Sequence, residues 1–203
     1  GLGDVYKRQV LSVYFSALTA FAIHAYDFKL KKFAFTFILL VMMVPTQVSA
    51  LGFVKMIGDW KLLNSYIPLI VPSIAAPVVF FFIKQYMDSV LPMELIEAAR
   101  IDGANTRQVI WSVMRPVVSP GLITVAVLIG LQSWNEYLIT STFLQGEKHF
   151  TATLGFLSMN GSYGSNMSIL MASAMILIGP IIVFFLLTQK HFVDGMVSGA
   201  VKG

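Results

Sequence analysis

The sequence of 203 residues contains no cysteine, which excludes disulfide bonds and thiolate metal sites. It also contains no Gly-Lys pair and so lacks the phosphate-binding Walker A loop, which means that an ATP-driven process would need its ATPase on another chain. Its three histidines, His24, His149 and His191, lie too far apart for a recognisable ligand motif, and we interpret them as interfacial or packed residues. The residues therefore predict no cofactor, no metal site and no enzymatic chemistry.

Charged residues are also scarce, at 12% of the chain against 57% hydrophobic residues. The mean hydropathy of +0.77 leaves too little polar surface for a soluble domain. The formal net charge is +4, but the basic residues are scattered through short connections and form no stripe, so nucleic acid is not an expected partner. This composition predicts a protein embedded in membrane lipid.

Long apolar segments make up most of the chain, and a helix that crosses the hydrocarbon core needs roughly 20 such residues. We expect five membrane-spanning helices, over residues 10–26, 33–54, 67–83, 117–138 and 167–187. Pro45 is expected to kink the second span, and Pro72 and Pro77 to interrupt the third. The predicted fold is an all-α, polytopic transmembrane bundle in the cell membrane.

The distribution of lysine and arginine predicts the orientation of these spans, because cytoplasmic loops carry an excess of both. The loop around Lys31, the segment 88–116 and the C-terminal tail are expected in the cytoplasm, and residues 55–66 and 139–166 outside. Residues 1–9, GLGDVYKRQ, disagree with this pattern, and we expect them to be a foreign segment or a truncation scar. The domain then covers residues 10–203.

A polar island interrupts the apolar segments in the middle of the chain. Residues 93–101 form a helix-competent run with acidic residues near its start and Arg100 near its end, which suits the helix dipole. Gly103 stands where a left-handed C-terminal cap would end this helix, and Asn105 with Gln108 resembles a capping box that starts another. The pattern predicts a two-helix bracket on one face of the membrane.

The motifs of this island resemble the EAA loop of ABC-importer permeases. They are Glu97-Ala98-Ala99, Asp102-Gly103-Ala104 and Pro116, and they are joined by Trp134-Asn135-Glu136 and the tail Ala200-Val201-Lys202-Gly203. Together they are similar to the carbohydrate branch, with its maltose-type and glycerol-phosphate-type permeases. Arg115 departs from the family, which usually has an apolar residue before the proline.

The resemblance implies a permease subunit of a type I ABC importer, which moves a carbohydrate across the cytoplasmic (inner) membrane by alternating access. Such permeases typically have six spans, so the first would be missing here. The resemblance also implies three protein partners: an ATP-binding subunit dimer, a second permease subunit and an external or periplasmic solute-binding protein. Within the cytoplasmic loop 88–116 it assigns the ATPase-coupling role to Glu97, Ala98, Ala99, Asp102, Gly103 and Ala104. The alternative role for Glu97 is a local ion pair with Arg100, three residues later.

A second polar group lies near the outer end of the fourth expected span. We predict that Trp134, Asn135, Glu136 and Tyr137 line the substrate path, because sugars offer hydroxyl groups and apolar ring faces to such side chains. An acidic residue near the middle of a membrane helix costs roughly 3 kcal/mol, so it usually faces a bundle interior or an aqueous cavity. The alternative is that Glu136 is solvated at the outer interface.

Other functions remain open at this point. A permease of the same superfamily for a non-sugar solute would share the EAA loop and differ mainly at residues 134–136 and in the tail. An ion-coupled secondary transporter would work without an ATPase, but it would normally carry ionisable residues in several spans, and here Glu136 alone qualifies. A passive connecting loop would need neither the alanine pair nor a glycine at position 103.

Overall fold

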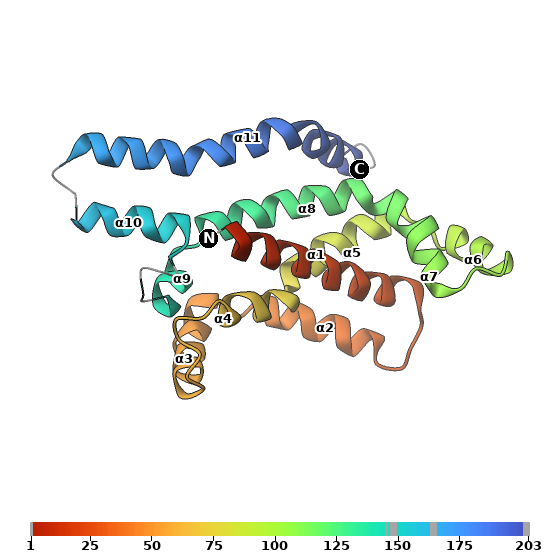
Figure 1. Cartoon of the computed structure of the whole chain (residues 1–203). Helices are drawn as coiled ribbons and strands as arrows, with labels where there is room; N and C mark the ends of the chain where they lie inside the picture. The colour runs from red at the N-terminus through yellow and green to blue at the C-terminus, as the bar shows by residue number, and fades with distance from the viewer. Residues whose placement is uncertain (1, 145, 147–149, 163–165, 201–203) are drawn as a thin grey trace. The chain divides into compact units, whose positions relative to one another are not determined.

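A computed structural model of the chain describes residues 2–144, 146, 150–162 and 166–200, and within these ranges the regular structure is entirely helical, with no strand. This confirms the predicted all-α class. The elements in Figure 1 are α1 (Leu2–Ala25), α2 (Lys31–Met42), α3 (Thr46–Asp59), α4 (Ile67–Ile70), η1 (Val71–Ile74), α5 (Pro77–Val90), α6 (Met93–Ile101), α7 (Thr106–Gln108), η2 (Val109–Met114), α8 (Arg115–Asn135), α9 (Leu138–Phe143), α10 (Ala152–Ser162) and α11 (Met167–Ala200).

The chain divides into two compact units. Unit 1 consists of Gly1–Leu11, Pro45–Ile74 and Leu128–Gln189, and unit 2 of Ser12–Val44, Ala75–Val127 and Lys190–Gly203. The helices α1, α8 and α11 each contribute residues to both units.

The core of unit 1 joins α3 and α4 to the segment after α8. Its buried members are Ile57, Leu69, Phe143, Leu144 and Leu154. Phe53 meets Phe143 edge to face, with ring centroids 5.4 Å apart. Asn64 adopts a left-handed backbone with φ of 60°, which asparagine tolerates better than most residues. Its N–H donates to the Phe143 carbonyl at 2.9 Å, so the connection after α3 is hydrogen-bonded to the end of α9.

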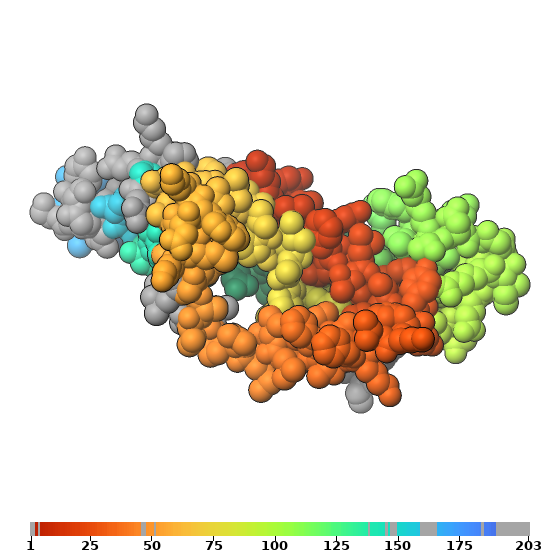
Figure 2. Space-filling view, turned by 90° about the horizontal axis from the view of Figure 1, so that it is seen from below, coloured from red at the N-terminus to blue at the C-terminus, as the bar shows by residue number. Residues whose placement is uncertain are grey.

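Helix α5 is central to unit 2 and buries Val79, Phe80, Ile83 and Met87. Helix α2 contacts α5, and Phe35 lies edge to face with Phe80 at a centroid distance of 6.2 Å. The twelve described residues of α2 include no buried side chain. Figure 2 shows the orange atoms of α2 along the face of unit 2 that is turned to the viewer.

Three helical stretches in the described part of the chain are long and apolar enough to cross a membrane: Ile67–Val90, Thr106–Asn135 and Met167–Gln189. They correspond to the third, fourth and fifth expected spans. As predicted, the first of them is interrupted near its prolines, because α4 passes into the 3-10 turn η1 around Pro72 and α5 begins anew at Pro77. The first expected span lies on α1, whose 24 residues include Lys7 and Arg8 before the apolar stretch and His24 near its end, and these polar residues reduce its hydropathy.

The second expected span is not one kinked helix. Helix α2 ends at Met42, and α3 begins at Thr46 after Pro45, which is extended with ψ of 127°. Proline cannot donate to the carbonyl four residues before it, and it disfavours helical backbone in the residue that precedes it. The resulting helices of 12 and 14 residues are each shorter than the roughly 20 residues that a crossing helix needs.

The helix that leads back from the polar island is longer than expected, because it is continuous from Thr106 to Asn135. Residues Val109–Met114 form a π-helical turn, η2. A widened turn suits this position, since Pro116 has no N–H to offer the carbonyl four residues earlier. Pro120 likewise leaves the Pro116 carbonyl without a backbone donor, and the Ser119 hydroxyl donates to that oxygen at 3.5 Å. Side-chain donors of this kind let a membrane helix contain proline.

Candidate functional site

The polar island forms the expected bracket, which we define as α6, the turn 102–105 and α7. Figure 1 shows it at one end of unit 2, between α5 and α8. Glu94 lies in the first turn of α6 and Arg100 in the last, where each charge opposes the helix dipole. Ile96 is fully buried, and α6 contacts η2. The bracket is therefore anchored to the helix that leads into α8.

Gly103 ends α6 as the sequence predicts, with a positive φ of 81°. Its N–H donates to the Arg100 carbonyl at 3.0 Å, and the Ala104 N–H donates to the Ala99 carbonyl at 2.9 Å. These two bonds define a Schellman C-cap, which satisfies carbonyls at the helix end that have no helical donor. An added Cβ at position 103 would meet no atom within 4 Å, so the glycine is required here by its backbone conformation.

The predicted capping box is also confirmed. The Gln108 N–H donates to Oδ1 of Asn105 at 3.0 Å, and the Asn105 N–H donates to Oε1 of Gln108 at 2.8 Å. One helix is thus terminated and the next begun within a few residues, each by its own local hydrogen bonds. The hydrogen bonds at the end of α6 and at the start of α7 together fix the backbone conformation of the turn 102–105.

Several side chains of the bracket remain open to a partner. Ile101 is 86% exposed and Leu95 is 44% exposed, and both lie outside the three stretches that could cross a membrane. Of the predicted coupling residues, Ala99 and Ala104 are half-buried, whereas the others are exposed: Glu97, Ala98, Asp102 and Gly103. No ion pair within the described residues involves Glu97. The guanidinium of Arg100 instead lies 4.7 Å from the centre of the Tyr26 ring, so the pair between Glu97 and Arg100, the alternative role for Glu97, does not form.

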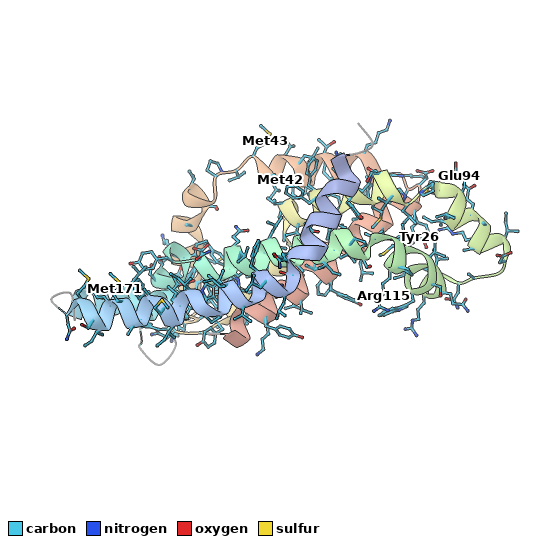
Figure 3. The ribbon with its side chains drawn as sticks, turned by 90° about the horizontal axis from the view of Figure 1, so that it is seen from above. Tyr26, Met42, Met43, Glu94, Arg115 and Met171 are labelled. Carbon is cyan, nitrogen blue, oxygen red and sulfur yellow. The ribbon has the colours of Figure 1, made fainter. Side chains whose placement is uncertain are left out.

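The end of α1 also reaches the bracket, which sequence reasoning did not foresee. Tyr26 shares a hydrogen bond of 2.9 Å with the Thr106 hydroxyl, in addition to its contact with Arg100. Nε2 of His24 donates to the Leu91 carbonyl at 2.8 Å, and Nδ1 of His24 lies 2.8 Å from the Asp88 carboxylate. Figure 3 shows Tyr26 beside the bracket, and Glu94 farther along α6. No sequence signal connects residues 64 to 80 positions apart, so these contacts were missed.

The predicted substrate-path residues lie together in unit 1, at the end of α8. The Asn135 amide donates to the Leu131 carbonyl at 3.0 Å, and Tyr137 is 45% exposed. Oε1 of Glu136 accepts the Ile139 N–H at 3.1 Å and so caps the start of α9. Glutamate is not a favoured N-cap residue, and Tyr137 occupies the N-cap position of α9, so no sequence signal indicated this contact.

Trp134 differs from its neighbours, because its indole N–H is buried and has no hydrogen-bond partner among the described residues. Its carbonyl accepts a hydrogen bond from the Thr153 hydroxyl of α10. Trp134 lines a pocket of about 250 Å³ in unit 1. The other lining residues are Gly130, Pro180 and Ile181, and Val5, Tyr6 and Gln9 from the N-terminal segment 1–9. The described residues contain no cluster of side chains suited to a metal ion.

Comparison with known proteins places this geometry in a family. Residues 12–197 match the model of the binding-protein-dependent transport system inner membrane component. The arabinooligosaccharides transport system permease protein AraQ of Halalkalibacterium halodurans is 37% identical over 96% of this chain and 69% of its own length. The melibiose/raffinose/stachyose import permease protein MelC of Bacillus subtilis is 31% identical over 96% of this chain and 71% of its own.

The fold has a counterpart among solved structures. A bacterial ABC transporter involved in the import of the acidic polysaccharide alginate matches with a TM-score of 0.75 over 94% of this chain and 73% of the other, at 21% identity. The matched family consists of transport permeases that work with a solute-binding protein and an ATP-binding subunit. With its apolar helices and its polar bracket, the chain belongs to the binding-protein-dependent transport system inner membrane components.

Proposed function

We propose that this chain is the carbohydrate-specific permease subunit of an ATP-driven importer in which the bracket is the docking site for the ATP-binding subunits. A second permease subunit completes the pore, and a solute-binding protein delivers the sugar from outside. Closure of the ATP-binding dimer pushes on the bracket and moves the helices between inward-facing and outward-facing states. Hydrolysis of ATP occurs on the partners.

The observation that carries this proposal is the exposed end of the bracket. Ala98 and Gly103 have little or no side chain and let a partner surface approach closely, while Ile101 offers apolar area at 86% exposure. The Glu97 carboxylate has no ion-pair partner among the described residues, so it is available to a donor on the ATP-binding subunit. A surface that combines small residues, apolar area and an available carboxylate on a pre-organised turn is suited to a protein groove.

The assignment to carbohydrates is supported by the two relatives described above, whose names specify arabinooligosaccharides and melibiose, raffinose and stachyose. The residues Trp134 to Tyr137 add an indole, an amide, a carboxylate and a phenol to one short segment of unit 1. Aromatic faces stack on sugar rings, and amide and carboxylate groups bond to sugar hydroxyls. We propose that these four residues line the outer half of the path.

Reconstitution tests the function directly. The chain is co-expressed with the ATP-binding subunit, the second permease and the solute-binding protein of the same genome, and the complex is placed in proteoliposomes. We expect uptake of radiolabelled arabinotriose or raffinose that requires internal ATP and persists when a protonophore has dissipated ion gradients. Uptake that collapses with the gradient and ignores ATP would instead indicate a secondary transporter, and a phosphorylated polyol taken up in preference to both sugars would indicate the non-sugar branch.

Substitutions at Glu136 separate its two roles. Glu136→Ala removes both the cap of α9 and the charge, whereas Glu136→Gln retains an oxygen that can accept the Ile139 N–H. We expect both variants to lower uptake in an assembled complex, by on the order of tenfold if one charge-assisted hydrogen bond to the sugar is lost. Normal uptake by Glu136→Gln with reduced stability of Glu136→Ala would leave the cap as the only role of this residue.

A further inference from the structure

We propose that Tyr26, supported by His24, is a positioning residue that latches the end of α1 to the bracket, so that movement of the bracket is passed directly to α1. This inference rests on the proposed coupling function of the bracket. Along the chain, the bracket is connected only to α5, through Leu91 and Pro92, and to η2 and α8. The latch adds a third connection, to a helix about 70 residues earlier in the sequence.

His24 joins α1 to the end of α5, from which the chain enters the bracket. Its side chain is only 9% exposed and bonds to two groups that belong to the same turn of chain, the Asp88 carboxylate in α5 and the carbonyl of Leu91, the C-cap residue of α5. The C-cap carbonyl of a helix has no helical donor, and a histidine N–H is a suitable replacement. Lys84 also pairs with Asp88 at 2.5 Å, which holds that carboxylate in place.

Tyr26 fastens the far part of the bracket, because a single side chain contacts both of its helices. The ring faces the Arg100 guanidinium in the last turn of α6, and the hydroxyl bonds to Thr106 at the first position of α7. These two contacts lie on either side of the Gly103 turn. Tyr26 therefore closes the turn from the side of the bracket that faces α1, and a displacement of either short helix pulls on the same ring.

The residues after Tyr26 form a short turn with its own local contacts. Asp27 pairs with Lys31 at 2.9 Å across the start of α2, and the hydrogen bond and charge of Lys31 lower the pKa of Asp27. The N–H of Lys31 donates to the Phe28 carbonyl at 3.0 Å. Before Tyr26, Ala25 is 4% exposed and ends α1. The ring thus projects from the short turn that connects α1 to α2.

The test uses the complete importer and variants that spare the ring. Tyr26→Phe and Thr106→Val each remove the same hydrogen bond and keep the contact with Arg100, while Tyr14→Phe removes an exposed hydroxyl elsewhere on α1 and is the matched control. We expect each of the first two to lower sugar uptake per ATP hydrolysed by about two- to tenfold, the range that one hydrogen bond supplies. The double variant should lose no more than either single one, because both delete one interaction.

A second readout reports on the latch without transport. Amide hydrogen exchange of residues 97–104 in the purified complex should quicken in Tyr26→Phe, Thr106→Val and His24→Ala, with co-purification of the ATP-binding subunit unchanged. Unchanged exchange and unchanged uptake in all three variants would overturn the latch and leave the proposed function intact, as would losses that multiply in the double variant. A wild-type complex that neither retains ATP-binding subunits nor hydrolyses ATP faster with sugar-loaded binding protein would overturn the proposed function itself, whatever the exchange result.

Discussion

Gly103→Val is expected to uncouple ATP hydrolysis from transport, lowering uptake by on the order of tenfold or more while membrane insertion persists. The backbone at Gly103 has φ of 81°, and an L-residue with a Cβ pays roughly 1–2 kcal/mol in that region, with β-branched residues the worst. Relief of this strain would shift the turn and break the Schellman bonds from Gly103 and Ala104. The exposed end of α6 would then no longer fit the groove that we propose on the ATP-binding subunit.

Matched variants identify the cause. Gly103→Asn tolerates the left-handed region and should keep most of the uptake, whereas Gly103→Ala should fall between asparagine and valine. Because an added Cβ meets nothing within 4 Å in this chain, a loss in the asparagine variant would point to a clash with the partner surface. Glu97→Ala in the same assay should lower substrate-stimulated hydrolysis with little change in stability, since Glu97 is exposed. Uptake, stimulated hydrolysis and co-purification that all remain normal in Gly103→Val and Glu97→Ala would refute the coupling role.

Gly121→Leu is expected to have the largest effect on folding. Gly121 is buried in α8, and a Cβ there would come within 2.6 Å of Cγ and Cε1 of Tyr86 in α5. These atoms belong to a rigid ring, so relief requires a new rotamer or a shift of α5 against α8. Overpacking of this kind costs about 1–3 kcal/mol, which outweighs the gain of about 1 kcal/mol that a helix makes when glycine is replaced. Since α5 and α8 lead into and out of the bracket, the distortion would spread to the proposed coupling site.

Thermal unfolding of the detergent-solubilised complex measures this effect. Gly121→Ala should lower the midpoint moderately and Gly121→Leu strongly, and Tyr86→Ala should restore part of the loss because it removes the ring that the new side chain meets. Gly52→Ala in α3 is the control, since a Cβ there meets nothing within 4 Å and should leave the midpoint unchanged or raise it. Equal midpoints for Gly121→Leu and wild type would show that α5 and α8 do not pack as closely as the structure has them.

Local features were predictable because the groups that form them are near one another in the chain. The capping box joins Asn105 to Gln108, and the Schellman bonds join Gly103 and Ala104 to residues three and five positions earlier, so backbone chemistry alone determines them. The third, fourth and fifth spans were equally predictable, since the hydropathy of a segment depends only on its own side chains. The substrate-path residues remain a proposal, because Trp134 to Tyr137 were chosen by chemical type, and type does not specify orientation.

The sequence by itself therefore determined the all-helical membrane class through its composition and long apolar segments, and the turn of the bracket and the family through short local motifs. Only the tertiary structure decided that Pro45 separates two helices instead of kinking one, since a kink needs neighbours that satisfy the freed carbonyl. It alone placed Tyr26 across Arg100 and Thr106, and His24 against Leu91. Those contacts join residues more than 60 positions apart, and such pairs meet only when packing of the helices repays the entropy of closing so long a loop.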